Sequence, residues 1–261
     1  MEALPFSYFS HYFPSSKSLG AVTNRILSSF GLRITRIHDW ADPTTYIPYA
    51  ETIAKAKASG LALGDYIDVR QGIAGTTAAT IQGMQRLGVF EKPVKSLLEI
   101  GPGTGRYLAK TIQLCSLDRC EVYETAIEWA RYIEKNYPVI LQPTDGGTLK
   151  ATRSDSVDLV QAHKVLCSTP FLTTARYWAE MLRVTRPGGY AVFDVATESC
   201  LPPAVVKLWA DSGMPSMSPY PAVVPYKVVL DFFEANGAKL VGTFYAALPP
   251  GKTEVFVFQK N

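Results

Sequence analysis

The sequence predicts an α/β fold built on a mostly parallel sheet that helices cover on both faces. Two observations carry this prediction. From Val94 onward, short apolar runs alternate with stretches of helical periodicity, and the last two apolar runs are joined by a short segment rich in turn-forming residues. Parallel strands need crossover connections, and helices in those connections cover both sheet faces, whereas a short turn-rich connection favours an antiparallel pair.

The elements expected around this sheet can be placed along the chain. The strand ranges are 96–100, 120–124, 138–142, 157–162, 190–195, 239–246 and 253–260, and helical periods follow most of the earlier ones. Before the sheet, apolar spacing predicts helices over 48–60 and 76–87. The segment GDYIDVRQGIAG between them predicts a loop, because it is rich in glycine and polar residues. We therefore expect a helical N-terminal extension or lid, 1–93, followed by the sheet-forming domain, 94–261.

Residues 1–47 are rich in serine and aromatic residues, and part of this segment would form a short helix with one apolar face. The face consists of Leu19, Val22, Ile26, Leu27 and Phe30. Burial by packing is the favoured interpretation, since few basic residues are present to hold anionic lipid. The alternatives are a membrane surface, a cover over the active site, or a neighbouring subunit in a homodimer.

Composition excludes several classes of protein. With 47% apolar and 19% charged residues, the 261-residue chain resembles an ordinary globular protein that buries its own core. Its formal charge of +3 and its scattered lysines and arginines argue against nucleic-acid binding. No secretion signal and no apolar stretch of about 18 residues is visible, so we expect a cytoplasmic protein without membrane insertion. The cysteines lack CxxC spacing and are expected to be reduced thiols; they are Cys115, Cys120, Cys167 and Cys200.

Three alternate glycines, Gly101, Gly103 and Gly105, directly follow the first predicted strand and precede a helix. Because a glycine has no Cβ, the backbone there can pass close to a ligand. A dinucleotide fingerprint has the spacing GxGxxG, whereas this loop reads GxGxG. A phosphate loop of the Walker type is also absent, because Arg106 follows the last glycine where that loop needs a lysine.

An acidic residue, Glu124, ends the second predicted strand, 19 residues after Gly105. A carboxylate at that point can accept hydrogen bonds from both ribose hydroxyls of a nucleoside held over the glycine loop. The glycine loop and the acid together therefore predict a nucleoside ligand. The alternative is a tight strand-to-helix turn without a ligand.

These motifs resemble those of class I S-adenosylmethionine-dependent methyltransferases. The matching segments are LLEIGPGTG, VYETA, the pair Asp145-Gly146, VDLVQAH and RVTRPGGYAVFD, in the family's order, and the resemblance spans about residues 94–261. It implies a Rossmann-like fold with a seven-stranded, mostly parallel sheet, an antiparallel terminal strand and an N-terminal helical cover. It also implies that S-adenosylmethionine is the methyl donor and S-adenosylhomocysteine the product.

The resemblance also implies roles for individual residues. Glu99 would orient the loop or meet the donor's amino group, and Glu124 would hold the ribose hydroxyls. Gly101 and Gly103 would lie against the methionine and ribose portions of the donor. The remaining members of the expected donor-binding set are Asp145 for the adenine amino group, Gly146 for its backbone N–H, and Gly105, Thr125 and Gln161.

A narrower resemblance is to bacterial sugar and polysaccharide O-methyltransferases, including the methylmannose-polysaccharide type. It rests on GRYL, YETAIEWA, SVDLVQAHKVL and GGYAVFDVATESCL, and it implies that the acceptor is a hydroxyl of a sugar or glycan. Those relatives often have HAH after the fourth strand, whereas this chain has Gln161-Ala162-His163, so a paired-histidine mechanism is not expected. The sequence offers no convincing cluster of metal ligands, and no metal is expected.

The expected catalytic base is His163. It comes just after the fourth predicted strand, at the edge where open parallel sheets bind ligands. An alcohol becomes a better nucleophile when a base with a pKa near neutrality takes its proton. The alternative is a hydrogen-bonded histidine of the core or of a loop.

Four further residues are candidates for the acceptor site. Tyr66 and Arg70 lie in the segment predicted as a loop, where they would reach the donor carboxylate or an acceptor hydroxyl, unless that loop is only a solvated polar segment. Trp209 and Tyr220 lie in a proline-rich insertion, 201–225, and their rings would pack against a sugar or a flat phenol. Simple structural packing is the alternative for both.

The sequence therefore favours an O-methyltransferase that acts on a sugar or glycan hydroxyl and does not bind nucleic acid. A phenolic or other natural-product acceptor is the alternative within the same reaction class. A different class is a catalytically silent module that binds S-adenosylmethionine. A nicotinamide oxidoreductase is disfavoured by the spacing of the glycines.

Overall fold

The computed structural model describes residues 47–211 and 221–261. Residues Tyr49–Asn261 form one compact unit. The apolar face expected around Leu19 and Phe30 lies outside the described residues. Within the two described ranges, no helix has the length and apolar character needed to cross a membrane.

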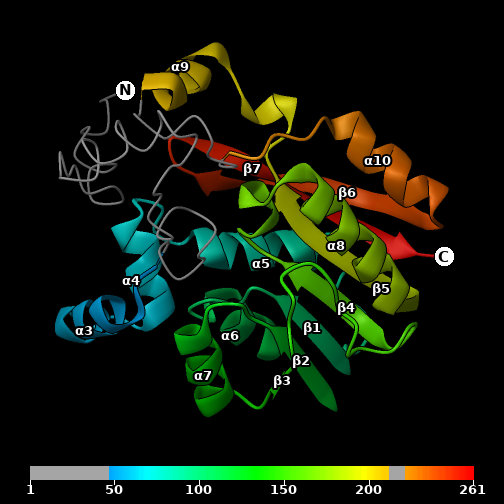
Figure 1. Ribbon diagram of the computed structural model, residues 1–261, viewed down its shortest axis with the longest axis horizontal. Coiled ribbons are helices and arrows are strands. Elements are labelled where there is room, and N and C mark those ends of the chain that lie inside the picture. The colour runs from blue at the N-terminus through cyan, green and yellow to red at the C-terminus, as the bar shows by residue number, and fades with distance from the viewer. Residues whose placement is uncertain (1–46, 212–220) are drawn as a thin grey trace, which may run out of the picture. The chain divides into compact units, whose positions relative to one another are not determined.

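The described residues form a seven-stranded sheet with the order β3-β2-β1-β4-β5-β7-β6 (Figure 1). Strands β1 to β5 pair in parallel, and β7 pairs antiparallel with both β5 and β6, so that only β7 runs against the others. The bounds are β1 (Ser96–Ile100), β2 (Arg119–Tyr123), β3 (Ile140–Leu141), β4 (Val157–Ala162), β5 (Thr185–Val195), β6 (Ala238–Leu248) and β7 (Gly251–Lys260). The predicted mostly parallel sheet with an antiparallel terminal strand is confirmed.

Strand β3 is shorter than the sequence predicted, because it pairs over two residues instead of spanning 138–142. It lies at the edge of the sheet beside β2. Pro138 and Pro143 flank it, and a proline supplies no backbone N–H to a strand ladder. The apolar character of this segment was therefore a correct sign of a strand but a poor guide to its length.

The two helices expected before the sheet are α3 (Tyr49–Ser59) and α5 (Thr76–Arg86). The segment between them was predicted to be a loop, and this prediction was wrong, because it contains α4 (Leu63–Arg70). Gly64, which suggested a turn, is a glycine for another reason. A Cβ at this position would lie 2.9 Å from Cβ of Arg106. Glycine at this position lets α4 pack tightly against the helix that carries Arg106.

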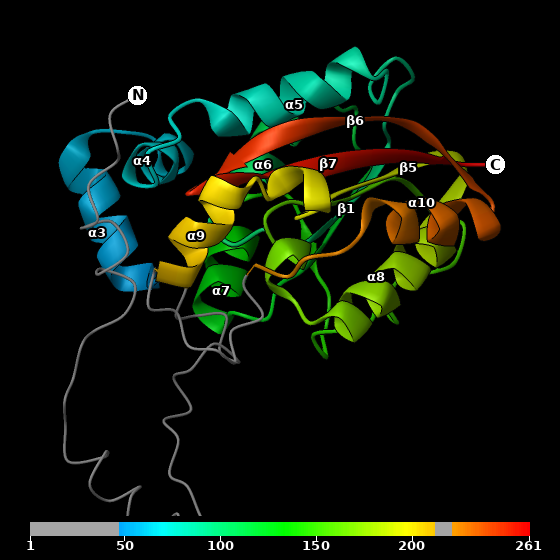
Figure 2. The same cartoon turned by 90° about the horizontal axis from the view of Figure 1, so that it is seen from above.

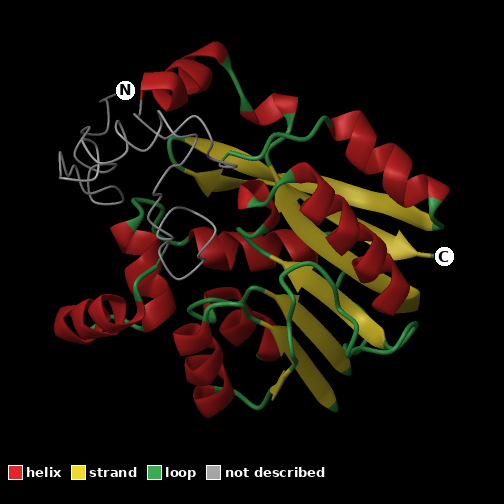
Figure 3. Cartoon of the chain, viewed as in Figure 1, coloured by secondary structure: helices red, strands yellow, loops and turns green. Residues whose placement is uncertain are grey.

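Helices cover both faces of the sheet, as Figures 2 and 3 show, with α5 on one face and α8 (Phe171–Val184) and α10 (Tyr226–Ala235) on the other. The side chains alternate accordingly. One buried cluster joins strand residues to α5, α6 (Arg106–Ile112) and α7 (Ile127–Asn136). Its strand members include Leu97, Leu159, Val192 and Val257. A second buried cluster joins the next residue of each strand to α8 and α10. These strand residues are Leu98, Val160, Phe193 and Phe258. Strands that are buried on both faces explain why the sequence shows continuous apolar runs there.

The carboxyl ends of the parallel strands meet at one edge of the sheet, where the remaining elements gather. Helix α4 contacts the start of α6 through the close approach at Gly64. Helix α9 (Pro203–Asp211) reaches the turn between β6 and β7, since a Cβ on Gly251 would lie 3.0 Å from Val205. Ligands bind outside this edge in open α/β sheets.

Candidate active site

The glycine loop joins β1 to α6, and its three glycines are needed for different reasons. A Cβ on Gly101 would lie 2.7 Å from Val165, and one on Gly105 would lie 2.7 Å from Ile133. These two glycines are needed for packing within the protein. Gly103 has a φ of +52°, and a Cβ there would meet no heavy atom within 4 Å. The loop therefore presents its backbone to open space at Gly103, where a ligand can approach closely.

The carboxylate of Glu124 holds this loop in place. It is buried, and its Oε2 accepts a hydrogen bond of 2.7 Å from the backbone N–H of Gly103, while Oε1 accepts one of 2.8 Å from Ala126. Burial raises the pKa of Glu124, and these backbone donors oppose that rise. Each carboxylate oxygen keeps a second lone pair, so the group can still accept ribose hydroxyls.

A chain of buried side chains lies at β1 and β4. Gln161 donates a hydrogen bond of 2.7 Å to Oε2 of Glu99, and Thr111 donates one of 3.1 Å to the amide oxygen of Gln161. Burial raises the pKa of Glu99 to about 8, against the hydrogen bond from Gln161. Gln161, expected to bind the donor, is thus seen as the partner that orients Glu99.

The loop after β3 contains Asp145 and Gly146. Oδ1 of Asp145 accepts backbone hydrogen bonds from Gly147 (3.0 Å) and Thr148 (2.8 Å), and Oδ2 accepts one from the Thr148 hydroxyl (2.8 Å). The Thr148 hydroxyl and the backbone donors hold the pKa of Asp145 well below its usual range. Asp145 therefore shapes its own loop. The loop reaches the end of β2, because a Cβ on Gly146 would lie 3.7 Å from Thr125.

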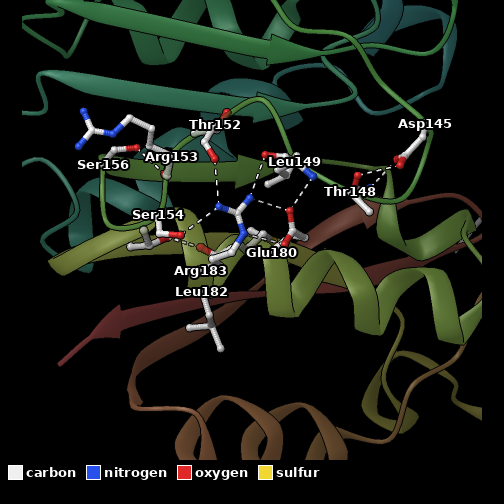
Figure 4. A network of polar contacts seen from close by, with 12 residues as sticks. Asp145, Thr148, Leu149, Thr152, Arg153, Ser154, Ser156, Glu180, Leu182 and Arg183 are labelled. Carbon is white, nitrogen blue, oxygen red and sulfur yellow. Dashed lines mark hydrogen bonds and ion pairs between the residues drawn. The ribbon is translucent and has the colours of Figure 1, made fainter.

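Two residues of α8, which the sequence analysis missed, anchor this loop (Figure 4). Arg183 donates to the carbonyl oxygens of Leu149 (2.9 Å) and Thr152 (3.0 Å) and pairs with Glu180 at 2.8 Å. Glu180 in turn accepts a hydrogen bond of 2.8 Å from the backbone N–H of Leu149. The i,i+3 spacing of an acid and an arginine on a predicted helix was the only sign of this pair in the sequence.

The predicted base, His163, follows β4 directly and is 5% exposed. Its ring stacks on that of Tyr107 with centroids 4.5 Å apart, and neither ring nitrogen has a hydrogen-bond partner among the described residues. Burial lowers the pKa of His163 to about 4; Asp194 acts against this fall, while Lys164 and Arg106 add to it. The imidazole is therefore neutral at neutral pH and has a lone pair that can take a proton.

A buried ion pair lies beside His163, and the sequence analysis did not find it. Lys164 contacts Asp194 at 3.0 Å, and both side chains contact the hydroxyl of Thr253 at 2.5 Å. Lys164 also has a φ of +60°, a strained conformation for a residue with a side chain. The three residues come from the ends of β4 and β5 and from β7, and no spacing along the chain links them.

Another buried ion pair connects α4 to the helix after the glycine loop. Arg106 donates a hydrogen bond of 2.8 Å to Oδ1 of Asp68 and one of 3.2 Å to Gln71. Asp68 also accepts bonds from the backbone N–H and the hydroxyl of Thr77 at the start of α5. Arg106, for which the sequence suggested no function, thus fixes α4 and α5 against the glycine-loop helix.

Three of the four candidate acceptor residues lie in the described ranges, on two different helices. Tyr66 and Arg70 lie on α4, and a guanidinium nitrogen of Arg70 lies 3.4 Å from the hydroxyl of Thr52 on α3. Trp209 is buried on α9. Tyr220 lies outside the described residues. In the same described part of the chain, no group of three His, Cys, Asp or Glu side chains is placed to hold a metal ion.

Comparison with known proteins identifies this arrangement. Residues 98–193, from β1 to β5, match the family model of a methyltransferase domain. The chain therefore contains a methyltransferase domain. Among curated proteins, no sequence matches it significantly.

Solved structures share the fold of this methyltransferase. Magnesium protoporphyrin IX methyltransferase from Synechocystis PCC 6803, with bound S-adenosylhomocysteine, is 12% identical, with a TM-score of 0.59, and the match covers 86% of this chain and 98% of that one. The N-methyltransferase NodS from Bradyrhizobium japonicum WM9, in complex with S-adenosylhomocysteine, is 17% identical, with a TM-score of 0.52 and coverage of 71% and 87%. The fold is the Rossmann-like class I methyltransferase fold, and the Synechocystis enzyme has also been solved with bound S-adenosylmethionine.

The residues at the sheet edge fit this donor. Gly103 presents its backbone to open space. The Glu124 carboxylate, which accepts a hydrogen bond from the N–H of Gly103, has further lone pairs that can accept ribose hydroxyls. When bound, the donor supplies a methyl group on a positively charged sulfur. The protein's task is to align an acceptor with that methyl group, exclude water and take up the acceptor's proton.

Proposed function

We propose that this methyltransferase transfers a methyl group to a hydroxyl of a sugar or glycan, with His163 as the general base. One observation carries the proposal. His163 lies at the carboxyl end of β4, buried and neutral, with no hydrogen-bond partner for either ring nitrogen among the described residues. A structural histidine in the core is normally hydrogen-bonded, whereas a base that waits for its substrate is not.

The surroundings of His163 keep this base uncharged until the acceptor's proton arrives, with a pKa of about 4 that lies below the near-neutral value of an efficient general base. Burial keeps the imidazole neutral, so its lone pair is available at neutral pH. The carboxylate of Asp194 nearby favours the imidazolium that forms when the acceptor's proton arrives, although Lys164 and Arg106 weaken this effect. Such a preorganised charge stabilises the transition state more than the ground state.

Donor binding is assigned to the glycine loop and to the loops that follow β2 and β3. We propose that Gly103 and Glu124 contact the ribose and that Glu99, held by Gln161, meets the donor's ammonium group. The other proposed donor contacts are Gly101, Gly105, Thr125, Asp145 and Gly146. Asp145 already accepts hydrogen bonds from its own loop, so the adenine amino group would share this carboxylate with Thr148.

The choice of a sugar or glycan rests on the sequence resemblance to polysaccharide O-methyltransferases, and a phenolic acceptor is the alternative. Methyl transfer from labelled S-adenosylmethionine to two acceptor pools tests both, with one pool of sugars and short glycans and one of phenols and polyketide-like alcohols. Label in the sugar pool supports the proposal. Label only in the phenolic pool would mean that the acceptor is a phenol or a similar alcohol and not a sugar.

The same assay with His163→Gln tests whether His163 is the base. We expect the His163 variant to bind the donor normally but to transfer methyl groups about 10²- to 10⁴-fold more slowly. Tryptophan fluorescence quenched by S-adenosylhomocysteine measures donor binding. Full activity in a folded His163→Gln protein contradicts the role of the base, and donor binding without transfer to either pool favours a silent binding module.

A further inference from the structure

Three buried polar atoms without a partner lie on two stacked rings at the sheet edge. They are Oη of Tyr107 and both ring nitrogens of His163, and none of them has a hydrogen-bond partner among the described residues. The residues are 2% and 5% exposed, with nearly parallel rings at an angle of 27°. Buried polar groups are normally satisfied, so unpaired atoms concentrated in one place indicate a polar group that binds there.

The same charged groups surround both rings. Arg106, Lys164 and Asp194 act on the hydroxyl of Tyr107 and also on the imidazole of His163, and Asp68 also acts on Tyr107. Lys164 and Asp194 are paired with each other, and Arg106 is paired with Asp68. Each of these charged groups therefore already has an oppositely charged partner. The Tyr107 hydroxyl and the His163 nitrogens still lack a hydrogen-bond partner among the described residues.

The protonation states of the two rings complement each other. Burial raises the pKa of Tyr107, so its phenol keeps its proton and donates a hydrogen bond. Burial lowers the pKa of His163, so its imidazole is neutral and accepts one. A hydroxyl group can accept a hydrogen bond from Tyr107 and donate one to His163, so a single group can pair with both rings. A carboxylate has no proton for His163, and an ammonium group has no lone pair for Tyr107.

We propose that Tyr107 is an acceptor-binding residue, whose hydroxyl donates a hydrogen bond to the oxygen of the acceptor's hydroxyl while His163 accepts that group's hydrogen. This inference rests on the proposed role of His163. One oxygen lone pair then takes the Tyr107 hydrogen bond, and the other attacks the methyl group. The O–CH₃ bond forms as the S–CH₃ bond breaks, the electron pair of that bond stays on sulfur, and the hydroxyl proton passes to His163.

Thermal unfolding of Tyr107→Phe tests whether the Tyr107 hydroxyl has a structural role. This change removes only the hydroxyl and keeps the stacked ring. Because the hydroxyl has no hydrogen-bond partner within residues 47–211 and 221–261, we expect the melting temperature of the unliganded protein to stay the same or rise. Tyr123→Phe is the matched control, since the buried hydroxyl of Tyr123 bonds to that of Thr152 at 2.9 Å, and its loss should lower the melting temperature by a few degrees. An equal fall in Tyr107→Phe would overturn the inference.

Binding is tested by NMR of the His163 ring, assigned by comparison with His163→Gln, in protein saturated with S-adenosylhomocysteine. The probes are phenol, benzoate and benzylamine. We expect phenol to shift the His163 resonances, and Tyr107→Phe to weaken that titration about tenfold, the equivalent of one hydrogen bond of about 1.4 kcal/mol. Benzoate and benzylamine should leave the resonances unchanged. No shift with phenol, or equal titrations for the two proteins, contradicts the inference.

The labelled-methyl assay separates this inference from the proposed function. Transfer by the wild-type protein that Tyr107→Phe retains in full overturns the role of Tyr107 and leaves the function standing. A phenol titration that depends on Tyr107, in a protein that transfers to neither pool, supports hydroxyl binding and contradicts the function. Tyr190→Phe, on the part of β5 away from His163, controls for the loss of a tyrosine hydroxyl elsewhere.

Discussion

Glu99 shows how one buried side chain makes the stability of this methyltransferase depend on pH. Its carboxyl is 1% exposed, and burial raises its pKa from 4.5 to about 8. The folded protein therefore holds a proton that the unfolded chain releases above pH 4.5. The stability that this carboxyl contributes is fully present below pH 4.5 and is lost as the pH rises through 8.

We predict that the unliganded protein loses about 1 kcal/mol of stability per pH unit between pH 6.5 and 8, and that Glu99→Gln removes this loss. His163 does not interfere in this window, because its pKa is lowered from 6.5 to about 4 and its effect falls below pH 6.5. Urea unfolding at several pH values provides the measurement. An equally steep loss in Glu99→Gln would mean that another group causes it.

At the level of single residues, the sequence predicted the glycine loop after the first strand but not the contacts inside it. Gly103 and Glu124 could be singled out because a nucleoside ligand requires a bare backbone and an acid at fixed places. The pairing of Glu99 with Gln161 was not predicted, nor was a Tyr107 hydroxyl without a partner in the described part of the chain. Such contacts depend on side-chain directions across two strands or a helix, about which spacing along one chain says nothing.

At the level of elements, the buried pair of Arg106 and Asp68 decides where α4 lies. The side chains are 7% and 2% exposed and meet at 2.8 Å. Loss of one partner leaves an unpaired buried charge. The pair also explains why α4 escaped prediction, since glycines and acids suggest a turn until the tight contact of Gly64 with Arg106 is known.

We predict that Arg106→Met costs about 3 kcal/mol or more of stability. The double variant Asp68→Asn with Arg106→Met should cost less than the sum of its parts, because neither charge is then left alone. Lys227→Met, which breaks an exposed pair with Asp231, should cost less than about 1 kcal/mol. Chemical denaturation measures all of these. Additive costs for Arg106 and Asp68 would show that the two charges do not depend on each other.

At the level of the whole molecule, strand order brings the site together. β1 lies between β2 and β4, so that Glu99, Glu124 and His163 reach one edge from three neighbouring strands. The sequence predicted this edge correctly, because alternating strands and helices permit few topologies. It did not predict that Thr253, from the far end of the chain, completes the ion pair next to His163.

We predict that S-adenosylhomocysteine stabilises the whole unit, by about 2.7 kcal/mol at a hundred times its dissociation constant, and that NAD does not. Glu124→Gln should reduce this stabilisation strongly, because it weakens both the ribose contact and the hold on Gly103. Thermal unfolding over a range of ligand concentrations measures both effects. An undiminished shift in Glu124→Gln would remove this residue from the donor site.

Strand β7 has a consequence for the order in which the protein is made. It follows all the other strands in the chain, yet it lies inside the sheet between β5 and β6. While the ribosome is still adding residues, the first five strands can pair, but β5 keeps an open flank. The Lys164 and Asp194 pair gains its Thr253 contact only when β7 slides into that flank. A nascent chain can thus pair β1 to β5 early, while the contacts of Lys164 and Asp194 with Thr253 form only after β7 has been made.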